Sequence, residues 1–132
     1  MADPNLISST QIQQLGGSTR QYKSGLLHTI DLSPVGASID DTWISQLAGQ
    51  TKLVELNLKS TAITDQAILQ LEKFSTLETL DLSDTQITDL ALETISRMHH
   101  LRVVVVTGTN VTQQEIRKIR ASMINTRIIH LE

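Results

Sequence analysis

The sequence predicts an α/β solenoid, a fold in which one strand–turn–helix unit is repeated and stacked. Leu53, Leu77 and Leu101 recur at a constant interval of 24 residues, and self-similarity at such a period is typical of repeat architectures. Within each interval the spacing of apolar residues changes from two to about 3.6, as it does where a strand is followed by a helix. Aromatic residues make up only 2% of the chain, so the core must be built from aliphatic side chains, which suit a thin, layered interior.

We expect four such units over residues 27–126, with an insertion of two residues around Pro34 to Ala37 in the first. One unit alone cannot bury its apolar side, so neighbouring units must stack. Residues 1–26 are predicted to form an N-terminal capping helix and a hairpin strand, and residues 127–132 a C-terminal capping strand. The predicted boundaries of the four units are 27–52, 53–76, 77–100 and 101–126.

The first half of each unit alternates apolar and polar residues, which is typical of a strand with one buried side. The second half has apolar residues at helical spacing. Strands that recur after right-handed crossovers are expected to lie parallel to one another. The inward strand pairs are Ile30 and Leu32, Leu56 and Leu58, Leu80 and Leu82, and Val104 and Val106; the helical positions are Ala67, Ile68, Leu71 and Phe74, matched by Ala91, Leu92, Ile95 and Met98.

A threonine precedes each of the later helices, where its hydroxyl can accept a hydrogen bond from a free backbone N–H. Asp65 and Asp89 follow two of these threonines and place negative charge at the positive end of the helix dipole. Asp40 takes the cap position in the first unit, and the last cap is expected to form a capping box with Glu115. The cap threonines are Thr64, Thr88 and Thr112; a second set at the strand exits, Thr61, Thr85 and Thr109, is expected to satisfy turn backbone groups.

The pattern LxxLxLxxTxITDxxLxxL resembles the leucine-rich-repeat family, and more narrowly the 24-residue repeats of bacterial, notably planctomycete, proteins. The resemblance covers residues 27–126 and is weaker in the outer units, at the Pro34 insertion, at Val104 and Val106, and at Gln113. It implies a right-handed arc with parallel strands on the concave face and helices on the convex face. It also implies, by family habit, that the chain binds a partner, but it does not imply which one.

Both ends carry signals for lids. Ser8 to Gly17 is typical of a short capped helix ended by glycine, and a Ser24–Gly25 turn then predicts a hairpin. The last helix is expected to run to about Met123 and to be followed by a closing strand from Arg127. With both ends bracketed we expect a self-contained domain. The N-terminal segment also resembles that of bacterial repeat proteins with a membrane anchor just upstream, which suggests a longer natural protein.

Composition excludes several classes of function. The net charge of −3 and pI of about 5.7 do not favour nucleic acid. The locally basic C-terminal unit also lacks the aromatic residues on which bases would stack. There is no cysteine, and the longest apolar run, 103–106, is far shorter than the roughly 20 residues of a membrane span. We expect a cytoplasmic location by default, or an envelope-associated one if the chain is part of a membrane-anchored protein. The basic residues are Arg102, Arg117, Lys118, Arg120 and Arg127.

The residues that flank each inward strand pair are expected to form three ladders across the concave face. This surface is polar and mildly acidic through three units and becomes apolar at the fourth. A third ladder would follow the strands at Ser33, Lys59, Ser83 and Thr107. The candidate partner-binding residues are Thr29, Asp31, Glu55, Asn57, Lys59, Thr79, Asp81, Val103 and Val105.

Val103 and Val105 are β-branched residues at positions that would ordinarily meet water. Burial of each would contribute about 1.5 kcal/mol. Three interpretations remain open: the chain's own end covers them through Ile128 or Ile129, they form a partner-binding or weak self-association patch, or they are exposed without a role.

Asp31 and Asp81 would lie two strands apart, with backbones about 10 Å from each other. This separation resembles that of an inverting glycosidase pair, but an open surface without aromatic residues offers neither a substrate platform nor desolvation. We therefore expect no enzyme and no catalytic residues.

His99 and His100 are the closest approach to a metal motif in the sequence. Adjacent loop histidines point in different directions, and no third ligand follows at suitable spacing; His28 and His130 would approach only by chance of stacking. We therefore expect no metal and no cofactor.

Two functions remain at this stage. The first is a non-catalytic protein-interaction module with an unidentified protein partner, no nucleic acid and no membrane insertion of this segment. The alternative is an architectural or spacer domain of a larger bacterial envelope-anchored protein, without a ligand of its own.

Overall fold

The computed structural model describes residues 6–131, so the first five residues of the predicted N-terminal cap and Glu132 lie outside the described residues. It has one six-stranded sheet in which the strands lie side by side in chain order. β1 is antiparallel to β2, and every later neighbouring pair is parallel. The strands are β1 (Ser18–Gln21), β2 (Leu27–Asp31), β3 (Glu55–Asn57), β4 (Thr79–Asp81), β5 (Val103–Val105) and β6 (Arg127–Ile129).

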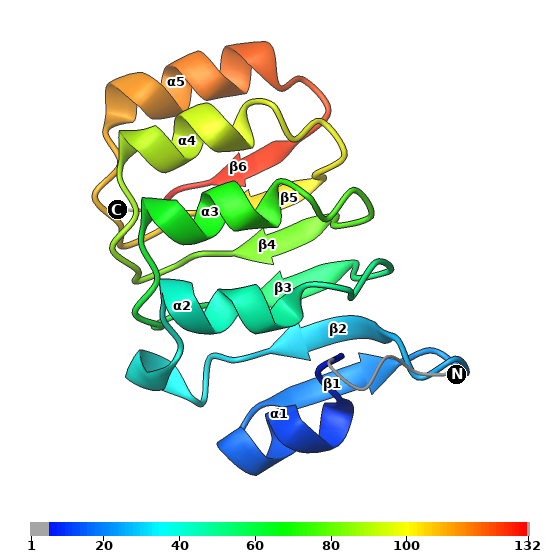
Figure 1. Ribbon diagram of the computed structural model, residues 1–132. Coiled ribbons are helices and arrows are strands. Elements are labelled where there is room, and N and C mark those ends of the chain that lie inside the picture. The colour runs from blue at the N-terminus through cyan, green and yellow to red at the C-terminus, as the bar shows by residue number, and fades with distance from the viewer. Residues whose placement is uncertain (1–5, 132) are drawn as a thin grey trace.

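The helices alternate with the strands and cover one side of the sheet. Figure 1 shows α2 to α5 stacked above one another on that side, with α1 beside β1 at the N-terminal end of the stack. In chain order, each of α2, α3 and α4 packs against the helix that follows it. The helices are α1 (Ser9–Leu15), α2 (Asp41–Ile44), α3 (Asp65–Leu71), α4 (Asp89–Ile95) and α5 (Gln113–Ser122), with short 3-10 helices η1 (Gly36–Ser38) and η2 (Ser45–Leu47).

The core lies between the sheet and the helices, and its aliphatic composition confirms the sequence prediction. All eight inward strand residues are buried, as are Ala67, Ile68 and Leu71 on α3 and their counterparts on α4. Phe74 and Trp43 are only partly buried and pack against this core. None of the helices within residues 6–131 is both long enough and apolar enough to cross a membrane.

The first unit is less regular than the others. η1 lies at the predicted insertion, and the helix expected after Asp40 has only four residues before η2 replaces it. Asp40 caps α2 as predicted, accepting a hydrogen bond from the Trp43 backbone N–H at 2.8 Å.

The N-terminal lid has the helix, the glycine end and the hairpin that the sequence predicts. Ser8 caps α1 in a full capping box with Gln11, and Gly16 ends the helix at a φ of 105°. A buried glutamine, which sequence reasoning missed, ties this lid to the stack. The Gln50 side chain accepts from the Leu27 backbone N–H at 2.8 Å and donates to the Ile7 carbonyl at 2.9 Å.

The predicted threonine caps are present at α3, α4 and α5, where each side chain accepts from a backbone N–H of the first turn. The strand-exit threonines Thr61, Thr85 and Thr109 donate to carbonyls three residues earlier, each at 2.7 Å. The expected capping box at α5 is only half formed. Thr112 accepts from the Glu115 N–H, but its own N–H donates to Asp89 at 2.8 Å.

The aspartates after the caps place negative charge at the helix starts, and they also bind the next unit. Asp65 accepts from the Thr88 backbone N–H at 2.7 Å and from its hydroxyl at 2.6 Å, so each aspartate binds the cap threonine of the next unit. Asp89 makes the same pair of hydrogen bonds to Thr112, and Asp41 makes it to Thr64. This inter-unit clamp fixes neighbouring helix starts relative to one another.

Candidate functional site

The strand register brings eight of the nine predicted binding residues into two rows across the sheet. The first row pairs Thr29, Glu55, Thr79 and Val103 in succession, and β6 adds Arg127 to its end. The second row pairs Asp31, Asn57, Asp81 and Val105, and β6 adds Ile129. We call these the outer row and the central row. Lys59, the ninth residue, lies just after β3 and is exposed.

A shallow hollow of about 250 Å³ lies on the face of the sheet that carries the two rows, over their middle. Of the nine predicted residues, only Lys59 and Val103 are absent from its lining. The lining residues are Thr29, Ile30, Asp31, Glu55, Leu56, Asn57, Thr79, Asp81 and Val105.

Side chains of the central row hold the turns that follow their strands. Asp81 Oδ1 accepts from the Ser83 backbone N–H at 2.9 Å and from the Ser83 hydroxyl at 2.6 Å. Asp31 makes the same two contacts with Ser33, at 3.0 and 2.7 Å. Asn57 Oδ1 accepts from the Lys59 N–H at 3.0 Å. Such local side-chain contacts are the usual means by which Asp and Asn stabilise a turn.

These turns correct one expectation about the third ladder. Ser83 is buried with 6% of its surface exposed, because its hydroxyl turns back to Asp81 and away from solvent. Only Lys59 of that ladder is clearly exposed, while Ser33 and Thr107 are half-buried.

The same contacts bear on the acid/base hypothesis for Asp31 and Asp81. Both carboxylates are fixed by their own turns, and β3 lies between their strands, which keeps the backbones about 10 Å apart. An arrangement of this kind presents fixed negative charge at a surface. Because each carboxylate is held by the serine of its own turn, Asp31 and Asp81 do not form a directly hydrogen-bonded acid/base pair.

The outer row offers the side chains that the fold itself does not use. Glu55 is exposed and Thr79 half-buried, and neither side chain makes a hydrogen bond or ion pair within residues 6–131. Thr29 differs, because its hydroxyl lies 2.7 Å from His28 Nδ1. A partner can therefore contact Glu55 and Thr79 without breaking a hydrogen bond or ion pair within the described residues.

Val103 and Val105 on β5, which we call the valine edge, lie beside the last strand of the sheet, β6. Val103 pairs with Arg127 and Val105 with Ile129, while Ile128 points into the core with 5% of its surface exposed. Both valines and Ile129 are half-buried. The end strand therefore extends the apolar edge by one residue.

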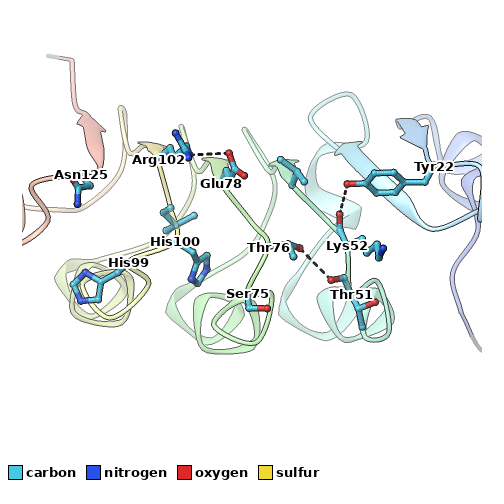
Figure 2. Close-up of a pocket in the computed structure, with 12 residues that line it drawn as sticks. Tyr22, Thr51, Lys52, Ser75, Thr76, Glu78, His99, His100, Arg102 and Asn125 are labelled. Atoms are coloured by element: carbon cyan, nitrogen blue, oxygen red, sulfur yellow. Dashed lines mark hydrogen bonds and ion pairs between the residues drawn. The ribbon is translucent and has the colours of Figure 1, made fainter.

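The histidines form no metal site in the part of the chain that the structure describes, where no group of three or more potential ligands gathers. His99 is exposed and His100 half-buried. They lie instead beside a larger hollow of about 950 Å³, at the edge where the helices lead into the strands (Figure 2). Sequence reasoning missed this groove. The available signal was a histidine at position 100, where the preceding unit has Thr76.

The molecule is thus an α/β repeat protein, in which a strand–turn–helix unit recurs with the same cap, the same clamp and the same row of side chains. A family model described as Leucine Rich repeat matches residues 75–96, which hold β4 and all of α4, so this unit of the chain is similar to a leucine-rich repeat. No curated protein matches the chain significantly. The narrower likeness to bacterial 24-residue repeats stays a prediction.

Proposed function

We propose that the chain is a non-catalytic protein-interaction scaffold that docks a partner protein on the outer and central rows. The observation that carries this proposal is the hollow over the two rows, which is lined by seven of the nine residues that the sequence predicts for binding. Repeat proteins of this kind use an extended surface built from equivalent positions of successive units. In the proposed geometry the stack is a right-handed arc with the rows on its concave side.

The chemistry of the rows defines the kind of partner that fits. Glu55, Asp31 and Asp81 place three carboxylates on the surface, and Lys59 is the single cation among the predicted residues. A complementary partner offers lysine or arginine side chains to these acids. It also offers an apolar side chain to the valine edge, where full burial of one valine would contribute about 1.5 kcal/mol.

The test uses charge reversal at side chains that the fold does not need. Asn57 and Asp81 are unsuitable because they hold turns, so the sheet-face variant carries Glu55→Lys with Thr79→Lys. A matched helix-face variant, Gln66→Lys with Glu93→Lys, changes the charge by the same amount on the opposite side. Each protein is immobilised, incubated with lysate of the source organism, and its captured proteins are quantified by mass spectrometry.

The proposal expects a protein that the wild type and the helix-face variant capture and that the sheet-face variant loses. Equal capture by all three proteins would remove the rows as the docking surface. Capture of nothing above the bare resin would favour the alternative, an architectural or spacer domain of a larger envelope-anchored protein. Under that alternative the chain's location is the envelope; under the main proposal we keep the cytoplasm as the default.

Self-association through the valine edge is a separate outcome. Light scattering after gel filtration distinguishes it, because a dimer would appear at high concentration in the wild type and disappear in Val103→Asp. If the wild type is a monomer at all concentrations, self-association through the valine edge is excluded, and the proposed occupant of that edge is a different protein.

A further inference from the structure

A second surface lies at the edge of the stack where each helix leads into the next strand. The hollow there, of about 950 Å³, extends from the N-terminal hairpin to the segment before β6. We call it the loop-edge groove. Figure 2 shows Tyr22 at one end, Asn125 at the other, and His100 between them on the side of Ser75 and Thr76.

The repeat pattern is broken in the middle of this groove. Thr76 donates its hydroxyl to the Leu53 carbonyl of the preceding unit at 2.7 Å, and Thr126 donates to the Leu101 carbonyl at 2.6 Å. The unit between them has His100 at the corresponding position, and its Nε2 is buried without a hydrogen-bond partner. Leaving a buried polar atom unpaired has a cost in stability that a threonine would avoid.

The charged side chains around His100 are mostly cationic. Lys52 and Arg102 line the groove together with His99, and Glu78 is the single carboxylate among the lining residues. Glu78 is paired with Arg102 at 3.2 Å. The Lys52 ammonium makes no ion pair within the described part of the chain. A chain of net charge −3 therefore carries a locally positive groove around one unpaired imidazole nitrogen.

We propose that the loop-edge groove binds a carboxylate-bearing peptide segment of a partner protein, with His100 Nε2 donating to a carboxylate oxygen and Lys52 supplying the opposite charge. The charge of the lining favours an anion, and the Ser75 and Thr76 hydroxyls beside it suit the polar backbone of an extended peptide. The terminal torsion of a histidine side chain is soft, so a modest rotation of the ring turns Nε2 towards the groove. This surface is separate from the rows, and the proposal does not rest on the proposed function.

Protonation of His100 couples this binding to pH. In the free protein the pKa of His100 is lowered below 6.5, first by burial and then by the neighbouring His99. The other titratable and charged groups that line the groove are Tyr22, Lys52, Glu78, His99 and Arg102. A bound carboxylate favours the imidazolium, so it raises the pKa of His100 and binding strengthens as the pH falls from 8 to 6.

The probe is a blocked pentaglutamate peptide, with blocked pentalysine as the negative control. Binding is followed by NMR, through the titration of the His100 ring protons and the backbone amide shifts. The proposal expects shifts at the groove with pentaglutamate alone, a raised pKa of His100 in its presence, and tighter binding at pH 6 than at pH 8. Absence of binding, or binding without a change in the His100 pKa, would overturn it.

Four variants distinguish a specific site from diffuse electrostatic attraction. His100→Thr installs the residue that the repeat uses at positions 76 and 126, so it should fold and should weaken pentaglutamate binding about tenfold, as the loss of one charge-assisted hydrogen bond does. Lys52→Ala should weaken binding, whereas Lys59→Ala, which removes the same charge from the sheet side, should not. Thr79→Ala, a neutral change in the outer row, should leave binding unchanged.

If Lys52→Ala and Lys59→Ala lose the same affinity for pentaglutamate, the net charge of the protein explains the binding. That result would overturn the proposal. Unchanged binding by His100→Thr would do the same. His100→Gln provides a second check that does not depend on the threonine variant, because it keeps a nitrogen donor and should retain part of the affinity. None of these results bears on whether the rows dock a partner, so the two proposals stand or fall separately.

Discussion

Replacing Asp65 with alanine should lower the free energy of unfolding by about 3.5 kcal/mol. The side chain accepts two hydrogen bonds from Thr88, from the backbone N–H at 2.7 Å and from the hydroxyl at 2.6 Å, and both residues are half-buried. A hydrogen bond to a charged group contributes about 1.5 kcal/mol at the lower end of the measured range. The carboxylate also lies in the first turn of α3, where it adds about 0.5 kcal/mol through the helix dipole.

Urea unfolding followed by circular dichroism measures this change, and a thermal scan should show the midpoint falling by about 10 °C. Asp65→Asn keeps one acceptor oxygen and should lose about half as much. Asp89→Ala is the matched comparison, because Asp89 makes the same two bonds to Thr112 but Thr112 is exposed, so water replaces the lost contacts and the loss should be about 1 kcal/mol. A loss below 1 kcal/mol at Asp65 would refute the clamp, and equal losses at Asp65 and Asp89 would refute the assigned effect of exposure.

Two further predictions concern the lid and the pH dependence. Gly17→Ala should lower the free energy of unfolding by about 2 kcal/mol in urea titrations, because a Cβ there would lie 2.8 Å from both the Asp31 carbonyl and an Ile12 methyl; Ser18→Ala, on the exposed start of β1, should change it little. Because the pKa of His100 is lowered on folding, the unfolded chain binds its proton more readily. Stability should therefore be complete above pH 6.5 and fall as the pH is lowered towards the folded pKa, and His100→Thr should flatten this part of the profile. A steeper profile in His100→Thr would contradict the assigned shift.

The fold was predictable because each unit repeats the same local signals in register. An aliphatic residue at every second strand position, a threonine or aspartate before the helix of each unit and an apolar helical face all act within one unit. The fixed interval of 24 residues then places the strands side by side. The irregular helix after Asp40 was not predictable in the same way, since the insertion in the first unit removes the register that the other units share.

Contacts between units were harder to predict. The sequence places Asp65 next to a helix start, which suggests a dipole role, but its main partner is Thr88 in the next unit, 23 positions later. The alternating pattern of β4 predicts that Ser83 lies at the surface. The turn held by Asp81 rotates it inward, and no strand periodicity predicts that rotation.

The two candidate surfaces differ in the same respect. The rows follow directly from strand alternation, so their members on β2 to β5 could be named from the sequence. The loop-edge groove could not, because it joins loops of several units to the N-terminal hairpin. The 24-residue repeat aligns His100 with Thr76, but it misses the second threonine of the series. Thr126 lies 25 positions after its acceptor Leu101, whereas Thr76 lies 23 after Leu53.

A site-specific photo-crosslinker tests the central proposal most directly. A benzophenone side chain placed at Thr79, in the middle of the outer row, is compared with the same group at Gln66 on the exposed side of α3, in cells of the source organism. If the rows dock a partner protein, irradiation should give a discrete adduct from position 79 and none from position 66. Adducts from position 66 alone, or the same adducts from both positions, would contradict it.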